Sequence, residues 1–169
     1  VNGVGKTTTI GKIAKKFSED LKLLPNAKLY AAASRNLDNA KRFATEMGYE
    51  KAYGSYDEMV NDPAVDVVYI ATPHSMHLEH SLLCLSHKKA VLCEKAFAMN
   101  SKEVQQMAEA SRQHQTFLME AFWTIFQAKF LKIIELSKDK ELGQLRFIKS
   151  DFMFNADFEN NKHYVTEYT

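Results

Sequence analysis

Residues 65–77 read VDVVYIATPHSMH, and this stretch indicates the fold class more clearly than any other part of the chain. Its first seven residues, 65–71, are almost continuously apolar, which is typical of a strand buried on both faces of a parallel sheet. Pro73 then turns the chain, and apolar residues recur at helical spacing over residues 76–86. The stretch therefore predicts a buried parallel strand that leads directly into a covering helix.

The same alternation of strand and helix extends along the chain. Apolar periodicity predicts helices over 10–24, 34–47, 56–61, 76–86, 101–114 and 128–136, and strands over 27–33, 52–53, 65–71, 90–93, 116–119 and 143–154. We expect Gly48 to end the second helix, and Ser55 and Ser101 to begin the third and fifth. This order predicts an α/β fold with a doubly wound, Rossmann-like parallel sheet, whose ligands bind beyond the carboxyl ends of the strands.

Composition excludes several classes of function. Of the 169 residues 46% are hydrophobic, and 22 Lys and Arg face 21 Asp and Glu, so the net charge of +1 gives no broad attraction for nucleic acid or anionic lipid. The two cysteines lack metal-ligand spacing and are expected to be buried free thiols. No apolar run approaches the roughly 20 residues that span a bilayer, and no signal-peptide core is visible, which predicts a cytoplasmic protein. With the charge balance and the cysteine spacing, we expect a small-molecule partner and no bound metal.

Polar residues follow the predicted strand at 27–33. Ser34, Arg35 and Asn36 stand where an acidic residue would bind the ribose hydroxyls of NAD and where an arginine accommodates the 2′-phosphate of NADP. This position favours NADP. The alternative is that Ser34 or Asn36 caps a helix and that Arg35 lies in solvent.

The segment after strand 65–71 offers a second set of candidates. Backbone donors from Ala71 onward and the Thr72 hydroxyl can hold a ribose or phosphate at the start of the next helix. His77 is a candidate for the same site, although a histidine in a first helical turn is more often structural or exposed.

Opposite charges directly follow the strand at 90–93. Lys95 can polarise a carbonyl or help to move the hydroxyl proton during hydride transfer, and Glu94 lies beside it. The alternative is a surface ion pair between the two. Glu120 follows the strand at 116–119 in the same manner, with Trp123 close by.

Four motifs, SRN, IATPHSMH, VLCEKAFAMN and FLMEAFW, resemble in order and spacing the Gfo/Idh/MocA oxidoreductase family, especially its dihydrodiol-dehydrogenase-like branch. The likeness covers about residues 11–155. It implies a dinucleotide-binding domain, then a sheet domain that carries substrate contacts and the interfaces of a homo-oligomer. It also implies hydride transfer between NADP or NAD and a hydroxyl of a sugar or cyclic diol.

The resemblance assigns roles to individual residues as well. It implies that Lys95 is the catalytic lysine and that Glu94 helps to orient the site. Thr72, Pro73 and His77 would line the nicotinamide side. Arg35 would lie at the adenosine 2′-phosphate.

The chain departs from the family pattern at two places in this region. Ala96 stands where the family usually has proline after the lysine, which should loosen the backbone that aims Lys95. The family's second half, with the rest of the substrate site, is not in the sequence. We therefore expect weak activity or none from this chain.

The amino-terminal segment departs further. If Gly11 and Ile13 belong to the glycine-rich motif that binds the cofactor pyrophosphate, its first glycine is replaced by Thr9. The same segment, NGVGKTTTIGKIAKKF, is similar to the P-loop of signal-recognition-particle-type GTPases over about 17 residues. That likeness implies that the amides of Gly3 and Gly5 and the side chain of Lys6 bind phosphates of GTP or ATP, with Thr7 on magnesium.

These observations give an expected organisation. Residues 1–121 would form the dinucleotide-binding domain, with 1–17 as a P-loop-like segment. Residues 122–169 would form a linker helix and the beginning of a truncated α+β substrate domain. The chain begins with Val1 and ends without a terminating signal, so we expect a fragment, and a recombined junction near Gly11 would explain both likenesses.

Overall fold

The computed structural model of the chain describes residues 4–138, 143, 144, 146–149 and 151, with side chains from residue 12 onward. The chain divides into two compact units, Val1–Trp123 and Thr124–Thr169. The predicted division into a dinucleotide-binding domain and a truncated substrate domain stays a prediction about function.

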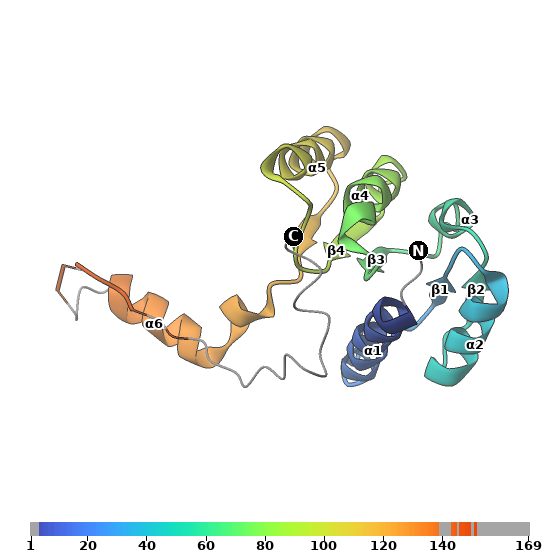
Figure 1. Cartoon of the computed structure of the whole chain (residues 1–169), viewed down its shortest axis with the longest axis horizontal. Coiled ribbons are helices and arrows are strands. Elements are labelled where there is room, and N and C mark those ends of the chain that lie inside the picture. The colour runs from blue at the N-terminus through green and yellow to red at the C-terminus, as the bar shows by residue number, and fades with distance from the viewer. Residues whose placement is uncertain (1–3, 139–142, 145, 150, 152–169) are drawn as a thin grey trace. The chain divides into compact units, whose positions relative to one another are not determined.

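The first unit alternates helices and strands (Figure 1). In chain order these are α1 (Val4–Leu21), β1 (Ala31–Ala33), α2 (Leu37–Met47), β2 (Lys51–Tyr53), α3 (Tyr56–Val60), β3 (Val67–Ile70), the 3-10 turn η1 (His74–Met76), α4 (His77–Ser86), β4 (Ala90–Cys93), α5 (Ser101–His114) and β5 (Leu118–Glu120). A second 3-10 turn, η2 (Trp123–Phe126), and the helix α6 (Ala128–Lys138) follow. The predicted α/β class is confirmed.

All paired strands run parallel, as expected for strands joined by helical crossovers. β1 pairs with β2, and β3, β4 and β5 form a second sheet in that order. In the usual doubly wound order a further strand lies between the positions that β1 and β3 occupy. Among the described residues no strand fills this place, so β1 and β3 each keep one open edge.

The core lies between the β3–β5 sheet and the two helices that cover it. Val91 and Cys93 of β4 are fully buried, as are Leu85 of α4 and Met107 of α5. Figure 1 shows α4 and α5 side by side next to these strands. Val68 and Ile70 of β3 are also buried, but Val67 is 60% exposed and Tyr69 is half-buried, so the predicted burial of residues 65–71 on both faces is wrong for the second face of β3.

Side-chain caps fix where several helices begin and end. Asn36 caps α2 by accepting a hydrogen bond from the Asn39 N–H, and Gly48 ends α2 with φ of 80°. Ser55 caps α3 as predicted. The predicted bounds of α5 are confirmed with Ser101 as its first residue, but the cap is Asn100, whose side chain accepts from the Glu103 N–H.

The described part of the second unit is mainly the helix α6. Its apolar residues Phe130, Leu131, Ile133 and Ile134 are exposed within the described structure. The strand predicted over 143–154 is not present in the described residues of that range, 143, 144, 146–149 and 151. Phe147 is 80% exposed there, and an alternating segment becomes a strand only where a partner strand and a covering layer bury its apolar side.

Candidate functional site

The candidate site lies where three parallel strands end together. Ile70 at the end of β3 pairs with Cys93 at the end of β4, and Cys93 pairs with Glu120 at the end of β5. The predicted residues Ala71, Thr72, Glu94 and Lys95 follow these ends directly, and the sheet therefore brings them to one edge. Because ligands of doubly wound sheets bind at the carboxyl ends of strands, this edge is the place to look for a cofactor.

The loop that carries Lys95 is fixed through its backbone by three of the predicted residues. Glu94 accepts a hydrogen bond from the Lys95 N–H at 3.1 Å, and Glu120 accepts one from the Phe97 N–H at 3.0 Å. The His77 Nδ1 lies 2.9 Å from the Ala96 carbonyl oxygen. The Lys95–Ala96 peptide is cis. The position of Lys95 is thus determined by contacts from β5, from α4 and from its own neighbour.

His77 joins the loops that follow β3 and β4. Its ring is fully buried, and its Nε2 lies 2.9 Å from the Thr72 carbonyl oxygen. Carbonyl oxygens only accept, so a ring nitrogen that carries a proton donates to the carbonyl oxygen beside it. The sequence left open whether His77 lines a ligand site or has a structural role. Both ring nitrogens contact backbone carbonyls inside the domain, which favours the structural role.

The Thr72 side chain has an internal partner as well. Its hydroxyl oxygen lies 3.0 Å from His80 Nδ1, and the His80 ring meets Tyr56 edge-on. Burial lowers the pKa of His80, the nearby Glu79 carboxylate opposes this shift, and the proximity of His77 and Arg35 adds to it. Pro73 is exposed and Ala71 is half-buried beside them.

Glu94 does not form the ion pair that the sequence left open. One carboxylate oxygen accepts from the Tyr69 hydroxyl and the other accepts from the Lys95 N–H. No carboxylate in the described part of the chain lies within 4.0 Å of the Lys95 ammonium. The exposed Lys95 ammonium is available to a bound group.

The segment after β1 combines the two roles that the sequence offered for it. Asn36 is the cap of α2, and the Ser34 hydroxyl accepts from the Asn36 N–H at 3.3 Å. Arg35 between them is exposed. Its guanidinium can therefore reach an anionic group at this end of β1 without first breaking a buried contact.

The amino-terminal candidates lie within a helix. Gly5, Lys6, Thr7, Gly11 and Ile13 all belong to α1, and in a helix interior each amide donates to the carbonyl four residues earlier. The Gly11 amide is therefore used inside the helix. Gly3 lies outside the described residues, and for residues 4–11 only the backbone is described. Ile13 is 38% exposed.

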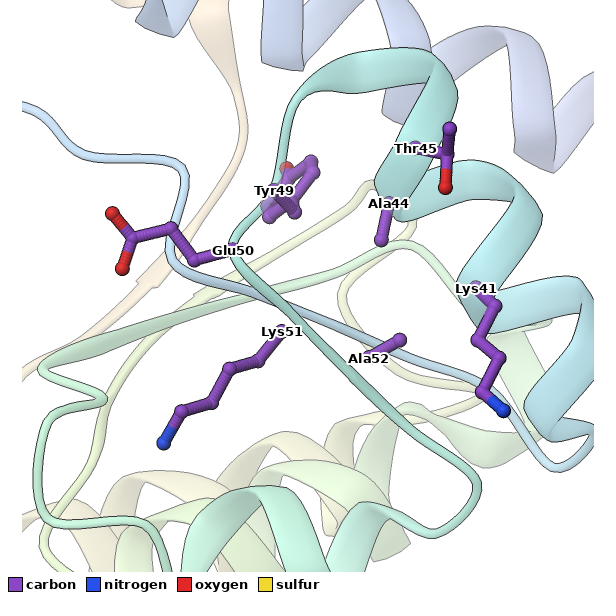
Figure 2. Close-up of a pocket in the computed structure, with 7 residues that line it drawn as sticks. All are labelled: Lys41, Ala44, Thr45, Tyr49, Glu50, Lys51 and Ala52. Atoms are coloured by element: carbon purple, nitrogen blue, oxygen red, sulfur yellow. The ribbon is translucent and has the colours of Figure 1, made fainter.

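An open hollow of about 380 Å³ lies elsewhere, beside the C-terminal half of α2 and the start of β2. Figure 2 shows Lys41 and Thr45 on one side of it and Glu50 and Lys51 on the other. It contains none of the predicted site residues. It adjoins the amino end of β2, whereas the candidate site is at the carboxyl ends.

Sequence reasoning missed two residues of the site, Tyr69 and His80. Both contact predicted site residues through tertiary hydrogen bonds. The only signal was position: Tyr69 is the polar member of an otherwise aliphatic strand, and His80 lies one helical turn after His77.

The described residues contain neither a membrane-spanning helix nor a metal-ligand cluster. No helix among them is long and apolar enough to cross a bilayer. No group of three or more His, Cys, Asp or Glu side chains in the same residues is arranged to hold a metal ion.

Parallel strands, helical crossovers and polar or basic residues at the strand carboxyl ends define a dinucleotide-binding type of α/β domain. Residues 9–122 match the Gfo/Idh/MocA profile, described as an oxidoreductase family with an NAD-binding Rossmann fold. The chain therefore belongs to the Gfo/Idh/MocA oxidoreductase family and contains its NAD(P)-binding domain.

Sequence relatives agree with this assignment. The chain is 45% identical over 144 residues to the trans-1,2-dihydrobenzene-1,2-diol dehydrogenase of Danio rerio, covering 84% of this chain and 43% of that protein. It is 40% identical over 146 residues to the Homo sapiens enzyme of the same name, covering 85% and 44%. The chain thus spans less than half the length of these relatives.

Solved structures show the same fold. An NAD-binding oxidoreductase from Klebsiella pneumoniae matches with a TM-score of 0.67 and 34% identity, over 82% of this chain and 36% of that one. A 3-ketoreductase from Actinomadura kijaniata, in complex with TDP-benzene and NADP, matches with a TM-score of 0.66 and 25% identity, over 72% and 38%.

Proposed function

We propose that this chain is the NADP-preferring nucleotide-binding domain of an oxidoreductase that transfers hydride between the nicotinamide and a hydroxyl of a sugar or cyclic diol. The observation that carries the proposal is the arrangement of Lys95. Its loop is fixed at the sheet edge by hydrogen bonds to Glu94 and Glu120. Its ammonium is exposed, and no carboxylate of the described residues lies within 4.0 Å of it. The diol dehydrogenases among the relatives support the class of substrate.

The residues at the edge fit a phosphorylated dinucleotide in charge and position. Arg35 is exposed after β1, where a guanidinium can pair with a 2′-phosphate, and Ser34 lies next to it. Thr72 and Pro73 follow β3, and Lys95 follows β4. NADP, when bound, supplies the hydride carrier, and these residues would hold its two ends.

The phosphate-binding part of the site fits less well. The Gly11 amide donates within α1, so it is not free for a pyrophosphate oxygen while that helix is intact. We therefore propose weak cofactor binding. We also propose that the chain alone has little turnover, because hydride transfer needs a closed substrate site that positions both reactants.

Residues 122–169 are proposed to be the linker helix and the beginning of a substrate-binding sheet domain. The partner is proposed to be a small molecule, because the net charge of +1 offers no broad attraction for a polyanion. A homo-oligomer remains part of the same proposal.

Side-by-side titration with NADPH, NADH and magnesium GTP tests the proposal. Trp123 is 66% exposed and is the only tryptophan, so its fluorescence and the thermal midpoint together report binding near the end of β5. We expect NADPH to bind most tightly. No response to any nicotinamide cofactor at millimolar concentration would contradict cofactor binding by this chain.

Magnesium GTP serves as the competing ligand because residues 1–17 are similar to a P-loop. GTP binding that is tighter than NADPH binding and is lost in Lys6→Ala would favour a nucleoside-triphosphate module instead. We expect Lys6→Ala to leave NADPH binding unchanged.

A further inference from the structure

Tyr69 lies in β3 between helix α1 and the loop that carries Lys95. Its ring stacks on Phe17 of α1, with centroids 3.8 Å apart and planes 18° apart. Its hydroxyl donates to one carboxylate oxygen of Glu94. The ring and the hydroxyl therefore each have a defined partner, which fixes the direction in which the phenol points.

The Glu94 carboxylate is engaged through both oxygens. The phenol of Tyr69 holds one, and the Lys95 N–H donates to the other at 3.1 Å. The Glu94 N–H in turn donates to the Ile70 carbonyl at 2.9 Å, which ties its backbone to β3. The carboxylate is half-buried and turned toward β3, although its neighbour in sequence carries an exposed ammonium.

Without the phenol, one oxygen of Glu94 would lack a partner. The nearest opposite charge in the chain sequence is the Lys95 ammonium on the next residue, and a flexible lysine side chain can reach a neighbouring carboxylate. Such a pair would neutralise the cation at the sheet edge.

We propose that Tyr69 is a positioning residue that keeps the Glu94 carboxylate away from the Lys95 ammonium, so that this ammonium stays free for a bound anionic or carbonyl group. The inference about Lys95 as a ligand contact rests on the proposed function, whereas the arrangement of the three side chains does not. Burial raises the pKa of the Tyr69 phenol, and the hydrogen bond to Glu94 raises it further, so the phenol remains a donor at physiological pH.

Acylation of lysines by an N-hydroxysuccinimide ester, followed by peptide mass spectrometry, tests the arrangement without any cofactor. The rate at Lys95 is divided by the rate at Lys102, an exposed lysine of α5 in the same molecule. We expect Tyr69→Phe, which keeps the stacked ring, to slow Lys95 acylation roughly twofold to fivefold, the range that corresponds to an exposed ion pair. In Tyr69→Phe/Glu94→Gln, where no carboxylate can pair with Lys95, the rate should return to that of the parent protein.

Tyr53→Phe is the matched control, because it removes a phenol–carboxylate hydrogen bond to Asp62 in another part of the first unit. It should leave the Lys95 rate unchanged. An unchanged or faster rate in Tyr69→Phe would overturn the proposal, since mere loosening of the loop exposes the amine. A rate that stays slow in the double variant would overturn it as well.

A measurement on the parent protein covers the case in which Tyr69→Phe does not fold. Added salt should leave the ratio of Lys95 to Lys102 acylation unchanged, because a free ammonium has no ion pair to screen. Acceleration of Lys95 by salt would overturn the proposal. NADPH affinity should fall in Tyr69→Phe, and failure of the parent to bind NADPH would count against the proposed function alone.

Discussion

At the scale of single residues, the site is determined by side chains that hold backbone rather than by side chains that face solvent. Glu94 contacts the Lys95 N–H, while His77 and Glu120 contact the carbonyl and the N–H of the single peptide group between Ala96 and Phe97. These three residues were predicted from strand ends and resemblance as parts of a cofactor site. In the structure these three side chains hold the backbone of residues 95–97 and thereby position Lys95.

Arg35→Ala tests the preference for NADP. Loss of the guanidinium should weaken NADPH binding by about tenfold or more, the scale of a charge-assisted contact to phosphate, and leave NADH binding nearly unchanged. Fluorescence titration of both cofactors measures the ratio. Arg112→Ala, which removes an exposed arginine from α5, is the control and should change neither affinity.

His77→Leu tests the buried bridge between the two loops. The substitution leaves the carbonyl oxygens of Thr72 and Ala96 without this partner, and we expect a loss of about 2 kcal/mol in the free energy of unfolding. Urea unfolding provides the value. His114→Leu, at the end of α5, should cost far less, and equal losses in the two variants would argue against the bridge.

At the scale of secondary-structure elements, the parallel sheet has a break between β1 and β3. Backbone bonds such as Ser34 N–H to Tyr53 and Glu94 N–H to Ile70 show which residues of β1 and β3 face their paired strands. Alternate residues face the open edges, and these are Ala31 and Ala33 in β1 and Val67 and Tyr69 in β3.

Hydrogen exchange can distinguish the two sets of amides. We expect the amides of Val67 and Tyr69 to exchange faster than those of Val68 and Ile70, which face β4. Exchange followed by two-dimensional NMR measures each amide separately. Equal protection of all four would mean that another segment pairs with this edge of β3.

The Asp62 side chain holds elements together at the amino end of the strands. It is 9% exposed and accepts from the Lys51 ammonium at 2.8 Å and from the hydroxyls of Tyr30 and Tyr53. The hydrogen bond from Lys51, then that from Tyr53, lowers the pKa of Asp62 well below its usual range. A depressed folded-state pKa stabilises the fold above the unfolded pKa of about 4, and this stabilisation is lost as pH falls toward the folded value.

Asp62→Asn should therefore unfold at lower urea concentration than the parent at neutral pH. The difference should shrink as the pH falls below about 4, because the Asp62 carboxylate takes up a proton in the unfolded parent before it does so in the folded parent. Asp38→Asn, an exposed change in the first turn of α2, is the control. A difference that grows on acidification would contradict this account of Asp62.

Elements with strong local signals could be predicted closely, and contacts between elements could not. Residues 90–93 and 101–114 match β4 and α5 because a short apolar run and a capped amphipathic pattern are local features. The partner of Glu94 could not be read from the sequence, since Tyr69 lies 25 residues away and reaches it through strand pairing. The strand expected over 143–154 is absent from residues 143, 144, 146–149 and 151, because alternation supplies one face of a strand but not its neighbour, and the rest of that range lies outside the described residues.

At the scale of the whole molecule, the described fold buries both cysteines. Burial raises the pKa of Cys84 to about 12 and that of Cys93 to about 12. Because the thiolate is the reactive form, folding should slow labelling by a disulfide reagent at about pH 8 by orders of magnitude, and both thiols should react promptly in urea. Rapid labelling of either thiol in the native protein would show that the core around α4 and β4 opens readily.

The central claim is that the carboxyl ends of β1, β3 and β4 form the nucleotide site, and NMR mapping with NADPH tests it most directly. We expect the backbone signals of Arg35, Thr72 and Lys95 to shift on titration, while those of Lys41 and Thr45 beside the hollow on α2 stay in place. Shifts confined to the hollow, or to residues 4–11 of α1, would contradict it.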